Sequence, residues 1–192
     1  MDVLKALRAF YEKQAHSMME RYNRLLPFGD LIADRWKKAS LLGFGTGTSV
    51  YDSSVIMGKV VIGKNTWIGP YTMLDGYHAK LQIGDNCCIS TGVQIYTHDS
   101  VGRCLTGGQQ SFVSAATAIG NNTYIGPNVI IVKGVVIGNH CIIGANSYVN
   151  RSFSDFSVAW GQPAKLKGKV IFSEDGMDYT IEHCGDDYSC DK

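Results

Sequence analysis

Residues 119–150 read IGNNTYIGPNVIIVKGVVIGNHCIIGANSYVN, and the period of this stretch indicates the fold. An isoleucine or valine returns at every sixth position, from Ile119 to Val149. A period of six matches neither the period of about 3.6 of an amphipathic helix nor the simple alternation of a strand. It fits a short strand and a sharp bend, after which the chain repeats. Three such sides close a triangle, so the stretch predicts a prism whose apolar residues stack from coil to coil.

The same period covers most of the chain, with two changes of register. All fifteen of its positions are apolar, and eleven of them are isoleucine. They are Phe44, Val50, Ile56, Ile62, Ile68, Leu74, Ile83, Ile89, Ile95, Ile119, Ile125, Ile131, Ile137, Ile143 and Val149. Glycine follows eight of them, and we expect it to supply the bends because it tolerates positive φ and crowding. Counting in threes predicts about five coils, over residues 44–154.

Two insertions interrupt the repeat, one between Leu74 and Ile83 and a longer one between Ile95 and Ile119. Repeat proteins accept insertions at corners, where the extra residues project from the body. We therefore expect a protruding loop after Ile95.

The segments outside the repeat define three parts of the chain. Residues 1–43 carry apolar side chains at helical spacing and predict an amphipathic helix that is a cap or a packing element for the open end of the prism. Residues 44–169 hold the repeat, and residues 170–192 predict a solvated acidic tail. The net charge of +1 gives no overall attraction to nucleic acid. Charges begin at Asp2 and Lys5, so we expect no membrane span or signal peptide, and we expect a cytoplasmic location.

Three runs of sequence resemble the hexapeptide-repeat acyltransferases: IGKNTWIGPYTM (62–73), IGDNCCISTGVQIYTHD (83–99) and the stretch 119–150. They look closest to the sugar and polysaccharide O-acetyltransferases related to the maltose and galactoside enzymes. The resemblance implies an all-β, left-handed parallel β-helix. It also implies acetyl-CoA as co-substrate, and a homotrimer with each active site between two subunits.

The resemblance places a catalytic histidine at the corner of the long insertion, where His98 stands. Imidazole suits a general base because its ordinary pKa of about 6.5 lies close to neutral pH. Asp99 follows it directly, and Asp75 lies at the first insertion. Either carboxylate is a candidate to orient the ring, as the acid does in catalytic triads.

Family positions that bind coenzyme A carry over to eight residues. They are Tyr124, Gly126, Ala145, Ser147, Asn150, Arg151, Lys165 and Lys167. The two lysines lie in GQPAKLKGK (161–169), which matches the closing motif of the family and could meet the CoA phosphates. A backbone N–H near Gly126 is expected to stabilise the oxyanion of the reaction.

Because the sequence departs from the family pattern at several positions, it does not identify the acceptor. Tyr124 stands where many relatives have tryptophan, and Asn150 and Arg151 replace a frequent Thr-Lys pair. The asparagine that helps galactoside and maltose acetyltransferases bind their acceptor has no counterpart around Pro70 and Tyr71.

Several functions remain possible from the sequence. The first is O-acetylation of a sugar hydroxyl, in cell-surface polysaccharide biosynthesis; the second is N-acetylation of a nucleotide-linked amino sugar. A non-catalytic hexapeptide protein is the third. The cysteines form no CxxC pair, and the histidines lack the paired spacing of zinc-dependent carbonic anhydrases, so no metal is expected.

Overall fold

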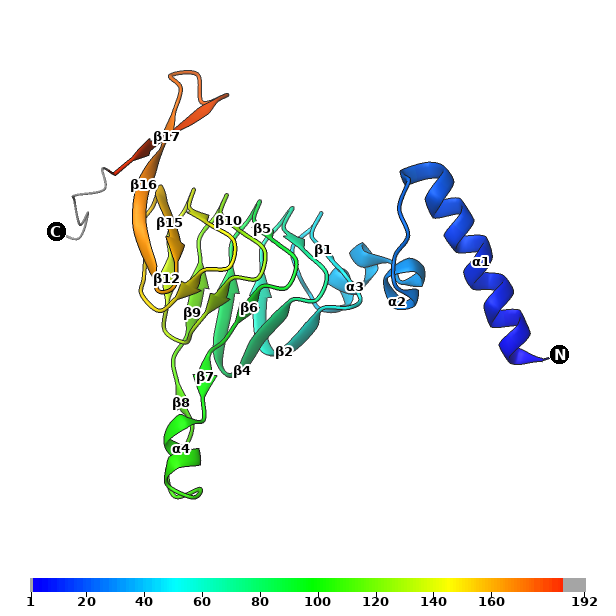
Figure 1. Cartoon of the computed structure of the whole chain (residues 1–192), viewed down its shortest axis with the longest axis horizontal. Helices are drawn as coiled ribbons and strands as arrows, with labels where there is room; N and C mark the ends of the chain where they lie inside the picture. The colour runs from blue at the N-terminus through cyan, green and yellow to red at the C-terminus, as the bar shows by residue number, and fades with distance from the viewer. Residues whose placement is uncertain (1, 185–192) are drawn as a thin grey trace.

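The computed structural model describes residues 2–184, whose central part is a parallel β-helix (Figure 1). Its first face stacks six parallel strands. They are β1 (Ser49–Val50), β3 (Trp67–Ile68), β5 (Cys88–Ile89), β10 (Tyr124–Ile125), β13 (Ile142–Ile143) and β15 (Ser157–Gly161). The predicted β-helix is confirmed. The count of five coils is one short, because β15 continues the stack beyond Val149.

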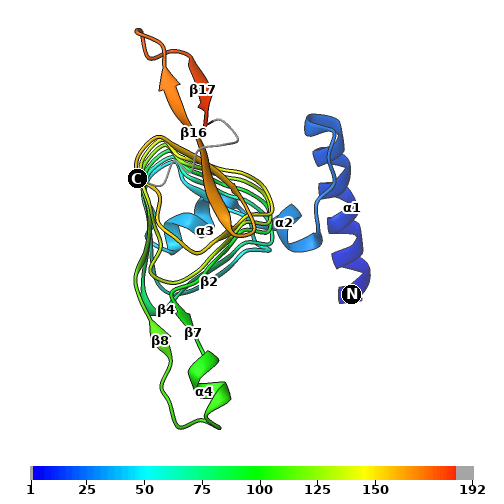
Figure 2. The ribbon, with the colours of Figure 1, turned by 60° about the vertical axis from the view of Figure 1, so that its left-hand side comes forward.

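Two strands turn a corner and so belong to both remaining faces: β2 (Val55–Ile62) and β4 (Met73–Ile83). The second face is completed by β6 (Gln94–Ile95), β11 (Ile130–Ile131) and β14 (Tyr148–Val149). The third face is completed by β9 (Thr117–Ile119) and β12 (Val136–Ile137). The end-on view shows the resulting three-sided outline (Figure 2).

The period-six residues fill the interior. Thirteen of the fifteen positions have an exposed fraction of at most 3%, and the other two, Phe44 and Ile56, pack against the same cluster. Burying one such side chain stabilises the fold by about 1.5–3 kcal/mol. The hydrophobic effect on this column therefore holds the coils in register.

A second column, of small polar side chains, links each coil to the next. The hydroxyls of Thr48, Thr66 and Thr123 donate to glycine carbonyls one coil later, at 2.7, 2.9 and 2.9 Å. Cys141 occupies the same column, and burial raises its pKa to about 11. The thiol therefore stays protonated at neutral pH and contacts the carbonyl oxygen of Ser154 at 3.1 Å.

The glycines that follow repeat residues do not provide the left-handed bends, since none of these eight has positive φ. Other corner glycines do, such as Gly92 with a φ of 71°. Positive φ falls at Asn65, Asn86, Asn122, Asn128 and Asn146, whose φ values run from 52° to 58°. Asparagine reaches this region because its short side chain bonds locally. The crowding part of the prediction holds: a Cβ on Gly84 would lie 2.8 Å from the backbone carbon of Gly120.

Three helices precede the prism: α1 (Val3–Tyr22), α2 (Phe28–Ile32) and α3 (Arg35–Leu41). The cap is α3, because Ala39 is buried in the core and the Lys38 ammonium donates to three main-chain carbonyls of the first coil. By contrast, α1 buries no residue and lies beside α2, to one side of the prism (Figure 2). The cap predicted for the long helix is thus wrong for α1. In the part of the chain described, no helix is long and apolar enough to cross a membrane.

Part of the predicted tail is a β-hairpin. Strand β16 (Ala164–Phe172) runs antiparallel to β15, and β17 (Tyr179–His183) pairs with β16. The prediction of a solvated segment overlooked the apolar run at its start, since Val170 is buried and its N–H donates to Phe156. Residues 185–192 of the predicted tail lie outside the described residues.

The glycine and asparagine positions of a corner respond differently to substitution. We expect Gly84→Ala to lower the free energy of unfolding by about 1–3 kcal/mol, because its Cβ would press on the next coil. Asn86→Gly is the matched control, since glycine adopts φ of 54° readily. Chemical denaturation measures both; equal losses would contradict this account of the corners.

Candidate active site

The long insertion rises from the corner between the second and third faces, here called the loop corner. Strand β7 (His98–Asp99) pairs with β8 (Val113–Ser114) as the stem, and α4 (Val101–Leu105) lies beyond it. This confirms the protruding loop, seen at the bottom of Figure 1. The stem fixes His98 at the base of the loop, against the prism.

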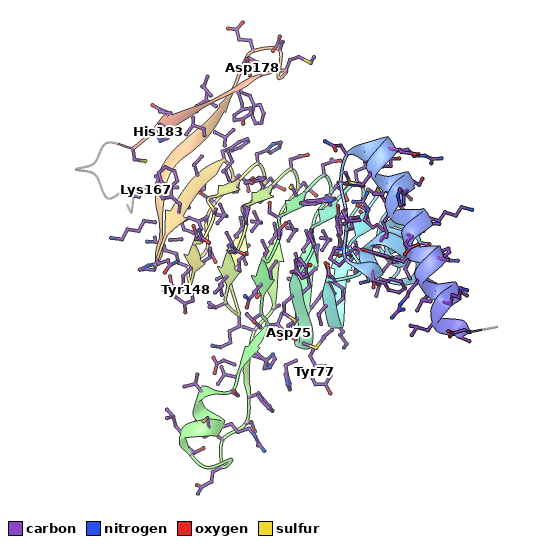
Figure 3. The ribbon with its side chains drawn as sticks, turned by 45° about the vertical axis from the view of Figure 1, so that its right-hand side comes forward. Asp75, Tyr77, Tyr148, Lys167, Asp178 and His183 are labelled. Carbon is purple, nitrogen blue, oxygen red and sulfur yellow. The ribbon has the colours of Figure 1, made fainter. Side chains whose placement is uncertain are left out.

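Asp75 lies at the loop corner one coil before His98, because Leu74 pairs with Ile95. Its Oδ2 is 2.6 Å from His98 Nδ1, and its side chain is almost fully buried while that of His98 is 24% exposed. The Tyr77 N–H donates to the other carboxylate oxygen at 2.9 Å. Figure 3 shows Asp75 where β4 meets the base of the loop.

The short His98–Asp75 contact is not an aligned hydrogen bond, since neither atom has a partner at an acceptable angle. Catalytic hydrogen bonds often align only once substrate is bound. A carboxylate at Nδ1 favours the tautomer that is protonated there. The Nε2 lone pair of His98 is then available as a base.

Asp99 contacts Lys133 and not His98. Its carboxylate contacts the ammonium of Lys133 and accepts from the N–H of Val101 at 3.0 Å. The Lys133 ammonium holds the pKa of Asp99 below its ordinary value. Of the two carboxylates predicted to orient His98, the geometry therefore favours Asp75, and Asp99 instead ties the loop to the following coil.

An aromatic cluster covers the other side of the histidine. The ring of His78 lies 4.3 Å from that of His98 and stacks on Phe112 at 4.5 Å, between centroids. Phe112 also meets His98 edge to face at 5.6 Å. The loop thus packs one of its own side chains against the candidate base.

A cavity of about 500 Å³ opens beside His98. It is lined by Tyr96, His98, Asp99, Ser100, Val101, Val132, Lys133 and Tyr148. A partly exposed imidazole backed by a buried carboxylate, beside a cavity of this size, can accept a proton from a bound alcohol or amine.

The residues predicted to bind coenzyme A do not gather in this cavity. Gly126 and Ala145 face each other on another corner, where a Cβ on Gly126 would lie 2.7 Å from the Ala145 nitrogen. The Gly126 N–H already donates to Ile143 at 2.8 Å, so it is not a free oxyanion donor. Ser147 is buried, and its hydroxyl donates to Gly144 at 2.6 Å.

The predicted phosphate-binding residues occupy two places. Asn150 and Arg151 lie at the loop corner two coils after His98, as the pairing of Ile131 with Val149 shows. The guanidinium of Arg151 lies 5.9 Å from the ring of Phe153. Lys165 and Lys167 lie on β16, at the end of the prism, with Lys167 labelled in Figure 3.

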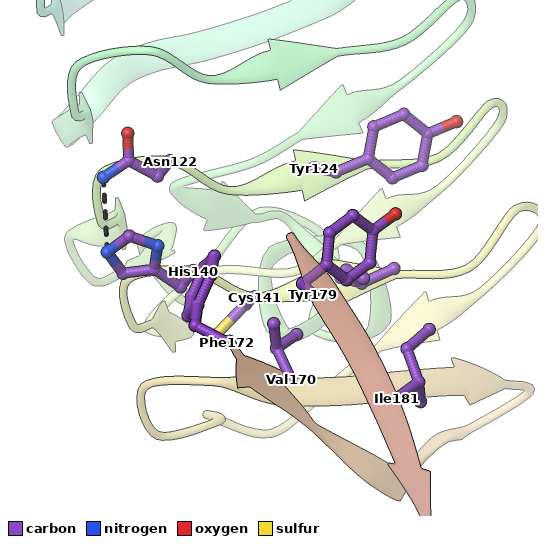
Figure 4. A pocket seen from close by; sticks show the side chains of 9 residues that line it. Asn122, Tyr124, His140, Cys141, Val170, Phe172, Tyr179 and Ile181 are labelled. Atoms are coloured by element: carbon purple, nitrogen blue, oxygen red, sulfur yellow. Dashed lines mark hydrogen bonds between the residues drawn. The ribbon is translucent and has the colours of Figure 1, made fainter. Parts of the chain in front are cut away.

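Tyr124 lines a separate cavity of about 470 Å³ beneath the C-terminal hairpin (Figure 4). This cavity is mostly apolar, with Val170, Phe172 and Ile181 along the hairpin side. Its histidine, His140, contacts the amide nitrogen of Asn122 at 3.3 Å. Among the described residues, no carboxylate lines the cavity, so they offer no counterpart there of the His98–Asp75 pair.

Lys133, Phe112 and His78 were not predicted from the sequence as residues of the active site. Coil register carries the signal for Lys133, which follows Ile131 as Thr97 follows Ile95. Nothing in the sequence marks Phe112, because its place depends on how the loop folds back. In the described part of the chain, no group of three or more side chains could hold a metal ion.

Comparison with known proteins identifies the family. The family described as "Bacterial transferase hexapeptide (six repeats)" matches residues 116–151. The putative acetyltransferase YJL218W of Saccharomyces cerevisiae is 33% identical over 169 residues, which cover 82% of this chain and 81% of that protein. The chain belongs to the hexapeptide-repeat acetyltransferase family. Matches to three other curated acetyltransferases span only 28–36% of their lengths.

Two solved structures share the architecture. The N-acyltransferase AntD from Bacillus cereus, a mutant in complex with dTDP and coenzyme A, superposes with a TM-score of 0.61. It is 26% identical, over 66% of this chain and 72% of that one. A maltose O-acetyltransferase from Clostridium difficile 630 has a TM-score of 0.55 and 25% identity, over 88% and 89% of the chains.

The Asp99–Lys133 contact predicts a measurable pKa. Asp99 should titrate below the ordinary aspartate value of about 3.9, and Lys133→Met should move its pKa back up. Carboxyl-carbon NMR against pH measures the shift, with Lys64→Met as the control at an exposed lysine on another corner. An Asp99 pKa that does not change in Lys133→Met would contradict the pairing.

Proposed function

We propose that this protein transfers the acetyl group of acetyl-CoA to a hydroxyl group of a sugar. The observation that carries the proposal is the buried Asp75 carboxylate against Nδ1 of a partly exposed histidine, at the mouth of a cavity on a hexapeptide prism. Family membership supports acyl transfer, and the relative crystallised with coenzyme A supports the donor.

His98 is the proposed general base. Its Nε2 takes the proton of the acceptor hydroxyl while the hydroxyl oxygen attacks the thioester carbonyl carbon. Asp75 stabilises the imidazolium that forms, because a buried carboxylate interacts strongly with a charge at contact distance. When the tetrahedral intermediate collapses, the carbon–sulfur bond breaks and the CoA thiolate leaves. The imidazolium returns its proton to that sulfur, so the base is regenerated.

The donor is proposed to run from His98 toward the C-terminal coils. Arg151, Lys165 and Lys167 would meet its phosphates there, because charge-assisted contacts to phosphate are strong. Tyr124, Gly126, Ala145, Ser147 and Asn150 complete the set expected from the family. Since Gly126 and Ala145 lie on another corner from His98, they would serve a donor bound between two subunits. This arrangement requires the homotrimer that the resemblance implies.

The acceptor nucleophile separates two candidate reactions. Similarity to the maltose enzyme over most of both chains supports a sugar hydroxyl, and a role in cell-surface polysaccharide synthesis would follow. Similarity to AntD, whose structure contains dTDP, supports an amino group on a nucleotide-linked sugar. Assaying thiol release with matched hydroxyl and amino sugars distinguishes them. No release with any acceptor would favour a non-catalytic role.

His98 variants test the base. His98→Ala should lower kcat about 10²–10⁴-fold, the usual loss when general-base assistance is removed. Asp75→Asn should give an intermediate loss of kcat, because it weakens the stabilisation of the imidazolium but leaves the base in place. His16→Ala, an exposed position on α1 away from the prism, is the control and should retain full activity. Release of CoA thiol from acetyl-CoA measures all three; a His98→Ala enzyme with more than about a tenth of normal kcat would remove the assignment.

A further inference from the structure

A second hollow opens next to the aromatic cluster, on the side of His98 that faces the N-terminal coils. It has a volume of about 530 Å³ and is lined by Lys59, Val61, Tyr77, His78, Ala79 and Lys80; we call it the lysine hollow. His78 links it to the candidate base, since the two rings lie 4.3 Å apart. A molecule in the lysine hollow would therefore reach His98 from the side opposite to Lys133.

The positive charge of the lysine hollow has no carboxylate partner. Neither Lys59 nor Lys80 pairs with an acidic side chain of residues 2–184, and the Lys80 ammonium donates to the neutral amide of Gln82 at 2.9 Å. On the loop side, the guanidinium of Arg103 lies 5.6 Å from the ring of Phe112 and adds a third basic group near the cluster.

The acidic residues of the prism are all engaged elsewhere. Their partners are Lys38 for Asp52, His98 for Asp75, the N–H of Lys64 for Asp85, Lys133 for Asp99 and the N–H of Asn139 for Asp155. Unpaired like charges around a hollow create a positive potential that concentrates anions there.

The two basic regions lie on opposite sides of His98 along the loop corner. Lys59 and Lys80 belong to the first two coils, as the pairing of β2 with β4 shows. Lys133 and Arg151 belong to the two coils that follow His98. A base that serves two substrates needs one on each side, and the C-terminal side is the proposed place of the donor.

The hollow also offers flat apolar surface. Tyr77 is 70% exposed, and its ring meets that of His78 edge to face with 5.0 Å between centroids. Exposed aromatic rings provide faces on which a sugar ring or a nucleobase can pack.

We propose that the lysine hollow binds the acceptor and that the acceptor is an anion, a sugar that carries a phosphate or a carboxylate group. This inference rests on the proposed function, since it takes His98 as the base shared by both substrates. The charge of Lys59 and Lys80 recognises the anionic group, and the aromatic cluster directs the sugar hydroxyl or amine toward His98.

The test is calorimetric binding to the full chain, with coenzyme A present at saturation. The probes are dTDP for a phosphate-bearing acceptor, glucuronate for a carboxylate-bearing one, and glucose as the neutral comparison. At least one anion should bind at least about 10-fold more tightly than glucose, and its Kd should rise with salt. Whether dTDP or glucuronate binds identifies the anionic group.

Variants locate the binding. Lys59→Gln and Lys80→Gln should each raise the Kd of that anion about 10-fold, the lower end expected for a charge-assisted contact. Lys59→Arg should keep most of the affinity, and Lys64→Gln is the matched control at an exposed lysine on another corner. Coenzyme A affinity should stay within about two-fold in every variant.

The outcomes separate this inference from the proposed function. If glucose binds as tightly as both anions, if Lys59→Gln and Lys80→Gln leave binding unchanged, or if coenzyme A displaces the anion, the inference is overturned. Acetyl transfer to a neutral sugar, abolished in His98→Ala, would leave the proposed function intact in that case. Anion binding that needs both lysines, without acetyl transfer to any acceptor, would instead retain the hollow as an anion site and remove the proposed function.

Discussion

The structure depends on one constraint: an apolar side chain must point inward at every sixth residue so that it can stack on its counterpart in the next coil. Residues such as Ile89, Ile125 and Ile143 are fully buried and form an uninterrupted column. Each contact is made with a neighbouring coil alone, as in other repeat proteins. The interior is therefore filled by apolar side chains, and the polar side chains that could bind or react with substrate lie at the corners or point outward.

Corners become sites because stacking brings together residues that are distant in sequence. At the loop corner, three successive coils are linked by two contacts, one between Asp75 and His98 and the other between Asp99 and Lys133. The insertion that follows His98 costs the prism little, since the strands on either side of it keep their register. It also shields one side of the imidazole through Phe112. The site is thus a consequence of the repeat together with one long loop.

The repeat could be predicted from the sequence because every sixth residue is apolar. Leu74 and Ile131, two of these residues, are fully buried as the pattern predicts. The conformation of the corners was harder to predict, because a glycine can be required either by crowding or by positive φ. Only the backbone structure shows that Asn86 adopts positive φ, while Gly84 is required by close packing against the next coil. The choice between Asp75 and Asp99 needed the coil register. Adjacency in sequence favoured Asp99, whereas stacking places Asp75 against the ring.

In the proposed arrangement, His98 stands between the donor on the C-terminal coils and the acceptor on the N-terminal coils. A crystal structure of the protein with coenzyme A tests it most directly. We predict the CoA sulfur within about 4 Å of His98, near van der Waals contact, with the pyrophosphate directed toward Arg151. A pyrophosphate bound instead between Lys59 and Lys80, or a sulfur at the cavity that contains Tyr124 and His140, would contradict the account.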